Sequence, residues 1–215
     1  MNQKTLRLVT SGVLIALGTV LSMIKVFDLP YGGSITLFSM VPLMVLGYMY
    51  GIRWGLLCGF VFGVLQAVLG ATASQAFAGV TGFNVVLMAF LDYIAAFMVL
   101  GLAGMFRKAI KKPALAFALG GLVAGLLRYV CHFLSGYILW GSYAEWFFGD
   151  VMNNDTGAYI LNSFKGDTLA ILYSLIYNAS YMLPEIAISV VGIVILMCVK
   201  PVRKQILSHA TALHK

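Results

Sequence analysis

Charged residues are scarce in this sequence of 215 residues. Asp, Glu, Lys and Arg together make up 10% of the chain, whereas 61% of the residues are apolar and the mean hydropathy is +0.97. A soluble domain carries about 25% charged residues, so this chain has too few to cover a water-exposed surface. The scarcity excludes a disordered chain and an ordinary cytosolic enzyme, and it indicates an integral membrane protein with one compact domain.

Several chemical motifs are also missing. The three cysteines, Cys58, Cys131 and Cys198, lie far apart in apolar stretches, which excludes a disulfide scaffold and a cysteine metal site. The sequence contains no G-x-x-x-x-G-K-[ST] phosphate loop, no H-E-x-x-H motif and no serine elbow motif. We therefore expect no ATP hydrolysis by this chain, no metal site and no resident cofactor.

Short polar or glycine-rich segments divide the apolar residues into six runs. Because a spanning helix needs about 20 residues, these runs predict an all-α membrane protein, a compact six-helix bundle that forms a single domain over residues 1–215. The first run lacks a cleavage site and is long enough to span, so it does not read as a signal peptide. The predicted spans are approximately 8–27, 35–50, 55–70, 83–105, 114–140 and 169–199, with an external loop at 141–167.

The basic residues predict the orientation. If the N-terminus is cytoplasmic, only Lys25 and Lys165 fall outside and Arg128 lies within a span, while the other Lys and Arg residues lie in cytoplasmic segments. Cytoplasmic loops of membrane proteins carry such an excess. We therefore expect both termini in the cytoplasm, and we attribute the net charge of +7 to anchoring at the bilayer and not to nucleic-acid binding.

A few polar side chains lie within the predicted spans, where each needs a partner or a cavity because an ionisable group in hydrocarbon is costly. The 1.5 Å rise of a helix places Asp92, His132 and Asn178 at one depth, roughly 12–14 Å below the outer boundary. Three polar groups at one depth on three helices predict a pocket that opens outward.

Helical spacing groups further side chains with these three. His132, Gly136 and Trp140 follow at intervals of four and share a face. The last span carries two neighbouring stripes, which are Asn178, Tyr181 and Glu185, and Tyr173 and Tyr177.

Structural roles compete with binding roles at these positions. His132 or Asn178 could be an interhelical hydrogen-bond partner, and Arg128 is expected to pair with Glu185, which lies at a similar depth. Asp92 has no obvious cation on a neighbouring helix. Its natural partner would therefore be a cationic ligand.

Five segments of the sequence resemble one known family. They are LLRYVCHFLSGYILWGS at 126–142, YSLIYNASYMLP at 173–184, PYGGSITLFSMVP at 30–42, FLDYIAAFMVLGLAGMFR at 90–107 and the glycine-rich residues 51–70. Together they are similar, in order along most of the chain, to the thiamine-specific substrate-binding (S) components of energy-coupling factor transporters. The resemblance implies a bacterial plasma-membrane protein that captures thiamine from outside. It also implies three partner subunits, a transmembrane coupling protein and two cytoplasmic ATPases.

The resemblance also implies a set of binding residues. Those that match the family are Asp92, Tyr93, His132, Trp140, Tyr173 and Asn178, and further candidates nearby are Tyr31, Ser34, Tyr177 and Glu185. Gly33 and Leu37 stand where some members have Trp and Glu, so Tyr31 or Ser34 would have to replace their contacts. The family carries a small-residue motif on its first span. In this chain its two positions hold Val13 and Leu17, while Gly12 and Ala16 have the same spacing one residue earlier.

Three alternatives remain open from the sequence. An S component for riboflavin or biotin would share the architecture, although anionic biotin does not suit Asp92. An intramembrane enzyme would need a nucleophile or metal constellation. A stand-alone facilitator would need a polar path inward, whereas the inner halves of the fourth and sixth spans are almost wholly apolar.

Overall fold

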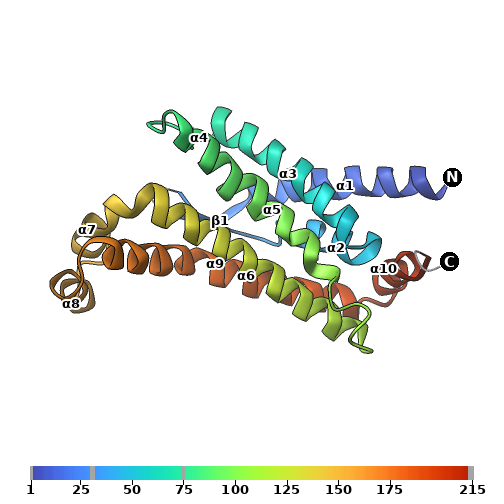
Figure 1. Ribbon diagram of the computed structural model, residues 1–215. Coiled ribbons are helices and arrows are strands. Elements are labelled where there is room, and N and C mark those ends of the chain that lie inside the picture. The colour runs from blue at the N-terminus through green and yellow to red at the C-terminus, as the bar shows by residue number, and fades with distance from the viewer. Residues whose placement is uncertain (1, 30–31, 74–75, 213–215) are drawn as a thin grey trace.

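The computed structural model describes residues 2–29, 32–73 and 76–212 as an elongated bundle of helices (Figure 1). The elements of its first half are α1 (Gln3–Met23), β1 (Lys25–Asp28), β2 (Ser34–Thr36), α2 (Val41–Tyr50) and α3 (Ile52–Thr72). A continuous rod of mixed helix type follows, made of α4 (Phe83–Met88), η1 (Ala89–Ala95), α5 (Ala96–Met98) and η2 (Val99–Gly104). The remaining elements are α6 (Pro113–Trp140), η3 (Gly141–Tyr143), α7 (Ala144–Trp146), η4 (Phe147–Val151), α8 (Asp155–Ser163), α9 (Gly166–Cys198) and α10 (Lys200–Ala212).

The prediction of an all-α membrane fold is confirmed. Five helical stretches among the described residues are long and apolar enough to cross a membrane, and α2 is a shorter apolar helix. At 1.5 Å per residue, α2 is about 15 Å long, or about half of a hydrocarbon core of ~30 Å. All ten residues of α2 are buried, so the other helices shield it from lipid.

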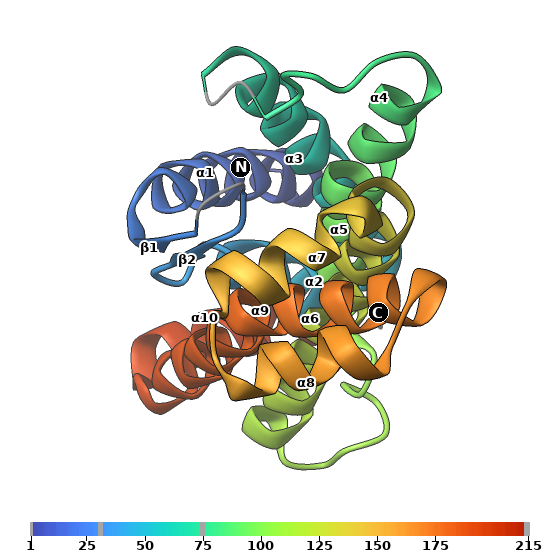
Figure 2. The same cartoon turned by 90° about the vertical axis from the view of Figure 1, so that its left-hand side faces the viewer.

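The helices fall into two groups around α2. Figure 2 views the molecule from the end that carries α7 and α8. In this view one group consists of α1, α3 and α4, and the other group consists of α6 and α9. The β1–β2 hairpin runs along the edge between the two groups (Figure 2). The beginning of α1 and the helix α10 lie together at the opposite end of the molecule (Figure 1).

The first predicted span runs past the end of α1, and the second begins before α2. Helix α1 ends at Met23, and residues 25–28 pair antiparallel with residues 34–36 instead of continuing helix. Gly32 and Gly33 have φ values of 105° and 83°, which glycine adopts without a Cβ penalty. The chain can therefore reverse here, and α2 begins only at Val41, next to Pro42.

The predicted external loop at 141–167 is largely helical. Its aromatic side chains Phe147 and Phe148 are buried with Ile160, and this cluster packs on Leu169 and Tyr173 of α9. The Asn154 side chain accepts a hydrogen bond from the Gly157 backbone N–H (2.9 Å) and starts α8. Burial of this apolar face holds the segment as a cap on the bundle.

A glycine seam joins α3 to the rod. Gly55, Gly59 and Gly63 recur every four residues along one face of α3. A Cβ added to Gly59 would lie 2.5 Å from the Phe97 carbonyl oxygen and 2.7 Å from the Met98 Cα. The two backbones are therefore in direct contact, as in small-residue packing of membrane helices.

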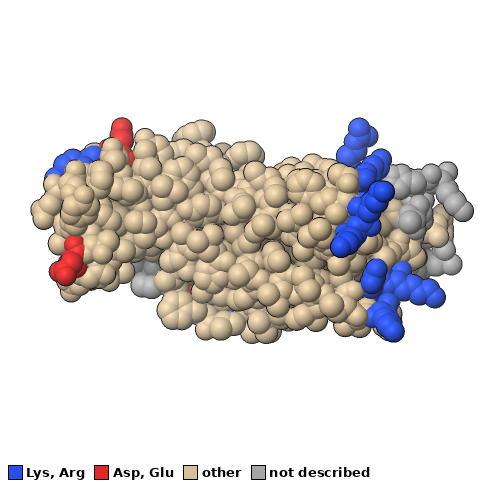
Figure 3. All heavy atoms as spheres, turned by 90° about the horizontal axis from the view of Figure 1, so that it is seen from below, with Lys and Arg blue, Asp and Glu red and all other residues tan. Residues whose placement is uncertain are grey.

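Charge is distributed asymmetrically along the molecule. Most of the Lys and Arg side chains in Figure 3 gather at the end near α10, whereas the acidic side chains and a smaller basic group appear at the opposite end. At the basic end, the Arg107 Nη1 donates to the Tyr48 carbonyl oxygen (2.8 Å) at the C-terminus of α2. A cation at that position suits the negative end of the helix dipole.

The glycine seam generates a stability prediction. Replacing Gly59 with Ala should lower the free energy of unfolding by about 1–3 kcal/mol, because a backbone cannot rotate away from the added methyl group. The matched control is Gly12→Ala on α1, where an added Cβ meets nothing within 4 Å. Thermal unfolding of the detergent-solubilised variants, followed by circular dichroism, measures the difference. Equal midpoints for the two variants would show that α3 and the rod are not in backbone contact.

Candidate functional site

Asp92 lies in the one turn of π-helix within the rod. The turn η1 spans Ala89–Ala95, between the α-helical residues of α4 and α5. A π-turn is wider than an α-helical turn and is frequent at functional sites. The turn presents the Asp92 carboxylate to α6, with 18% of the side chain exposed.

Three side chains of α6 form a polar network with Asp92. The Asp92 Oδ1 lies 2.9 Å from the His132 Nδ1, and the Ser135 hydroxyl donates to the Asp92 Oδ2 (2.5 Å). On the other side of the ring, the Arg128 Nε donates to the His132 Nε2 (3.3 Å). Because Nε2 accepts, the proton of a neutral ring lies on Nδ1, from which His132 donates to Asp92.

The expected ion pair between Arg128 and Glu185 is wrong. No salt bridge joins them among the residues that the structure describes. The Arg128 guanidinium instead lies over the Phe97 ring, with Cζ 4.4 Å from the ring centroid, and its Nη1 is buried without a hydrogen-bond partner in the described part of the chain. Arg128 turns away because His132, four residues later on the same helix, offers an acceptor one turn along.

Glu185 holds the start of α2 against α9. Its Oε2 accepts from the Thr36 backbone N–H (2.6 Å), and its Oε1 accepts from the hydroxyls of Thr36 (2.5 Å) and Ser39 (3.1 Å). Only 3% of the residue is exposed. These contacts satisfy Glu185 without Arg128, and they fix the end of the hairpin within the bundle.

The aromatic stripes of α9 form one ladder that leads to His132. The ring centroids of Tyr173 and Tyr177 are 5.6 Å apart, those of Tyr177 and Tyr181 are 6.2 Å apart, and Tyr181 and His132 lie 6.0 Å apart. Phe147 of η4 packs edge-on against Tyr173 and Tyr177. The ladder therefore connects the cap formed by α7, η4 and α8 with the Asp92 network.

Asn178 lies in this ladder and bonds to side chains and backbone of α9. Its Oδ1 accepts from the Tyr181 hydroxyl (2.7 Å), and its Nδ2 donates to the Ser174 carbonyl oxygen (2.8 Å). Gly136 of α6 makes the close approach possible, because a Cβ there would lie 2.7 Å from the Asn178 Nδ2. Asn178 is thus both an interhelical packing residue and a polar group next to the rings.

The hairpin covers one side of the ladder. The Tyr177 hydroxyl donates to the Gly32 carbonyl oxygen (2.6 Å). A Cβ on Gly33 would lie 2.7 Å from the Tyr181 ring, so the ring occupies the space that a larger residue at position 33 would need. Ser34 begins β2 and is half-buried, and the candidate Tyr31 lies outside the described residues.

The remaining two candidates lie at the edges of the network. The Tyr93 ring stacks on Phe77, with centroids 5.4 Å apart, and packs against Gly70 of α3. Trp140, at the end of α6, lies beside Tyr143 and packs against the cap. Tyr93 thus faces α3 and not the Asp92–His132 pair, since consecutive residues of a helix point in different directions.

The buried charges do not balance. Asp92 is bonded to the His132 ring and the Ser135 hydroxyl, and Glu185 is bonded to the Thr36 backbone and to the Thr36 and Ser39 hydroxyls. Arg128 supplies one positive charge, and His132 in its neutral form supplies none. Counted in their ordinary ionised forms, Asp92, Glu185 and Arg128 together carry a formal charge of −1. Within the described residues, no group of three or more His, Cys, Asp or Glu side chains could hold a metal ion.

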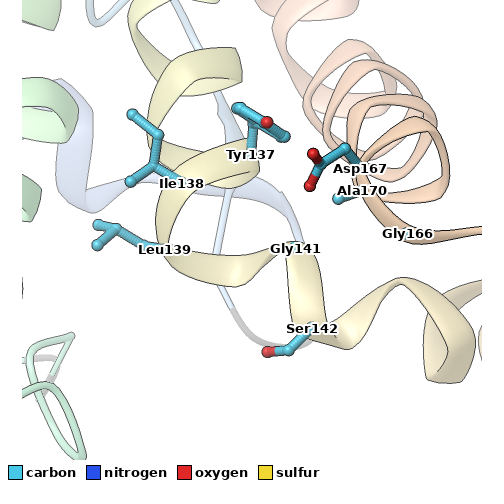
Figure 4. A pocket seen from close by; sticks show the side chains of 8 residues that line it. All are labelled: Tyr137, Ile138, Leu139, Gly141, Ser142, Gly166, Asp167 and Ala170. Atoms are coloured by element: carbon cyan, nitrogen blue, oxygen red, sulfur yellow. The ribbon is translucent and has the colours of Figure 1, made fainter.

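A separate open pocket lies nearer the end of the molecule that carries α7 and α8 (Figure 1). It has a volume of about 560 Å³ between the end of α6 and the start of α9, and Tyr137 and Asp167 stand on either side of it (Figure 4). The pocket is lined by Tyr137, Ile138, Leu139, Gly141, Ser142, Gly166, Asp167 and Ala170. It shares no lining residue with the Asp92 network.

Ser135 and Tyr181 were not named as binding residues from the sequence, although Tyr181 was grouped with Asn178 by its helical spacing. Ser135 lies three residues after His132 and donates to Asp92, and Tyr181 contacts both His132 and Asn178. Helical spacing places both on the faces of His132 and Asn178. That spacing is the signal that could have found them.

The sequence matches one family model and two characterised relatives. The model is that of the thiamine transporter protein family (Thia_YuaJ), and it matches residues 8–150. The chain is 28% identical over 214 residues to the thiamine transporter ThiT of Bacillus subtilis, which covers 94% of this chain and 96% of that protein. It is also 28% identical over 175 residues to the thiamine transporter ThiT of Lacticaseibacillus paracasei, covering 76% of this chain and 73% of the relative.

The fold is also similar to a solved structure. ThiT from Listeria monocytogenes superposes with a TM-score of 0.67 at 22% identity, covering 93% of this chain and 97% of that one. At this identity the likeness supports the fold alone, whereas the family model covers most of the chain. This multi-pass membrane protein therefore belongs to the thiamine transporter protein family.

Proposed function

We propose that the chain is the high-affinity substrate-binding subunit of an energy-coupling factor importer and that its substrate is thiamine. The observation that carries the proposal is the excess of one buried negative charge beside a ladder of aromatic rings. Thiamine has one permanent positive charge on its thiazolium ring. A desolvated carboxylate with aromatic faces is a physical match for such a delocalised cation.

Each candidate then has a role toward the ligand. Asp92 compensates the thiazolium charge, and His132 and Trp140 offer ring contacts. Tyr173 and Asn178 offer polar groups to the ring atoms of thiamine. The candidates around them complete the walls, with Tyr93 on the α3 side, Tyr177, Ser34 and Tyr31 on the hairpin side, and Glu185 holding that hairpin in place.

The sign of the charge separates thiamine from one rival vitamin. Biotin is anionic, and an anion entering this interior would add to the negative excess. Such a desolvated like charge is costly. Membership of a transporter family also favours carriage over an intramembrane enzyme.

The basic end of the molecule is proposed to be cytoplasmic, in the plasma membrane of a bacterium. Lys and Arg gather there (Figure 3), and cytoplasmic segments of membrane proteins carry such an excess. Thiamine would then enter from the acidic end, past the cap formed by α7, η4 and α8. Energy would come from a transmembrane coupling protein and two ATPases, because the chain has no phosphate loop of its own.

The charge match is tested by Asp92→Asn, which keeps the shape of the side chain and removes its charge. Losing one member of a buried charge pair typically costs about 3–5 kcal/mol, so we expect thiamine affinity to fall roughly 10²–10³-fold or more. Isothermal titration of thiamine against the purified protein measures it, with the exposed external Asp150→Asn as the matched control. An Asp92→Asn protein that binds within threefold of wild type would refute charge compensation.

Reconstitution in liposomes tests whether this chain binds thiamine while partner subunits supply ATP hydrolysis. The purified chain in liposomes should bind thiamine but show no ATP-dependent accumulation of it, since it has no means to hydrolyse ATP. Accumulation should begin when the coupling protein and both ATPases are added. Radiolabelled thiamine uptake with and without the partners decides the matter, and ATP-driven uptake by the chain alone would overturn it.

The partner surface is expected on the exposed small-residue face of α1. Gly12 and Ala16 are exposed, whereas Gly18 packs internally against Leu43 and Phe62. Gly12→Leu and Ala16→Leu should therefore impair uptake by the assembled complex and leave thiamine binding by the isolated chain unchanged. The matched control is Ala187→Leu, at an exposed alanine of α9. If binding fell while assembly persisted, this face would be internal.

A further inference from the structure

An apolar groove lies on the lipid-facing surface, away from the proposed thiamine site. It has a volume of about 400 Å³ between α1, α2, α9 and α10. Its walls are hydrocarbon except for Thr10 and Gln205. The lining residues are Thr10, Leu14, Leu17, Leu21, Phe38, Val41, Pro42, Val45, Met49, Gly192, Ile195, Leu196, Val202, Gln205 and Ile206.

The groove has the length of one membrane leaflet. From Thr10 to Leu21 it follows eleven residues of α1, which at 1.5 Å per residue is about 16 Å. A hydrocarbon core of ~30 Å has two leaflets, so the groove covers about half of it. Its two polar residues are Thr10, in the first half of α1, and Gln205 of α10. The beginning of α1 and the helix α10 both lie at the basic end (Figure 1).

Helix α10 provides both a wall of the groove and positive charge at its opening. Val202, Gln205 and Ile206 line the groove, while Lys200, Arg203 and Lys204 on the same helix are exposed. Ile206 is only 3% exposed, and His209 packs on Tyr50 of α2 (5.6 Å between centroids), so the helix is anchored on the bundle.

The chain offers no acid to this end of the molecule. All seven Asp and Glu residues lie outside the segments 1–7, 51–54, 105–113 and 199–215. The Lys and Arg band in Figure 3 therefore has its counter-charge elsewhere. An anionic lipid surface attracts such basic segments next to a membrane helix, by about 1 kcal/mol for each Lys or Arg, which is about fivefold in affinity.

We propose that this groove binds an anionic phospholipid of the leaflet at the basic end. One acyl chain lies along α1 between Leu21 and Thr10, against Val45 and Ile195. The headgroup phosphate lies at the start of α10, where Lys200, Arg203 and Lys204 supply the positive charge. The bound lipid fills the space between α1 and α9 and ties α10 to the membrane surface.

The geometry of α1 separates this site from the partner surface proposed on Gly12 and Ala16. At 100° per residue, Gly12 and Ala16 lie about 200–240° around the helix from Thr10, so they face away from the groove. Packing between membrane helices favours small residues, and Gly192 is the only residue of the groove lining smaller than threonine or proline. A partner helix seated on Gly12 and Ala16 would leave the groove open to lipid.

Native mass spectrometry of the detergent-solubilised chain tests the proposal with two lipids of identical oleoyl chains, phosphatidylglycerol and phosphatidylcholine. Wild type should retain one phosphatidylglycerol in preference to phosphatidylcholine. The triple variant Lys200→Gln, Arg203→Gln, Lys204→Gln should lose at least about tenfold of that preference. The matched control removes three positive charges at the same end, by Lys108→Gln, Lys111→Gln and Lys112→Gln, and should keep it.

A second pair of variants tests the acyl-chain site. Leu17→Trp fills the groove and should reduce retention of both lipids, whereas Val20→Trp on the exposed side of α1 should not. Equal retention of the two lipids by wild type, equal loss in both charge variants, or full retention by Leu17→Trp would overturn the proposal. So would a photoreactive residue at position 17 that crosslinks in membranes to a polypeptide and not to lipid.

Thiamine titration of the same samples keeps this test independent of the proposed function. None of the substituted residues touches the Asp92 network or the aromatic ladder, so all the lipid variants should bind thiamine as wild type does. A lipid preference that is lost with thiamine binding intact assigns the effect to the groove. If a variant lost both its lipid preference and its thiamine binding, the substitution would have disturbed the fold, and the groove site would be rejected.

Discussion

The high free energy of a charge in hydrocarbon is the constraint on which this structure depends. Asp92, Arg128 and Glu185 all lie within the helical bundle, and each is held by neighbours from other elements or by a neighbouring turn. Neutral His132 connects the one cation to one of the two anions, and the backbone and hydroxyls of residues 36–39 satisfy the other. In the proposed function, the charge that stays uncompensated favours a cationic ligand.

Close backbone contact makes this arrangement possible. Glycines on α3 let the rod approach until carbonyl groups meet the facing helix, and Gly136 lets α6 approach Asn178 in the same way. A π-turn in that rod then carries Asp92 toward α6. Helix packing and hydrogen bonding are therefore linked, since the glycines set the distance between helices that the polar side chains bridge.

The surface of α1 divides into three faces with different surroundings. Ser11 and Gly18 pack inward, with Ser11 accepting a hydrogen bond from the Trp54 indole (2.9 Å). Gly12 and Ala16 lie exposed on another face, and Thr10, Leu14, Leu17 and Leu21 line the groove. A single apolar helix can thus meet the bundle, a partner helix and a lipid without any one contact excluding the others.

The sequence by itself determined the membrane class, the all-α fold, the sidedness of charge and the short set of polar residues worth examining. These follow from composition and periodicity, which are local quantities. Only the tertiary structure decided the partners, because hydrogen bonds join residues far apart in the chain. Asp92 meets His132, Glu185 meets Thr36 instead of Arg128, and Tyr93 turns to α3. The strand at 25–28 and the helical cap after Trp140 likewise formed where apolar runs or a loop were expected, because pairing and burial against other elements outweigh local hydropathy.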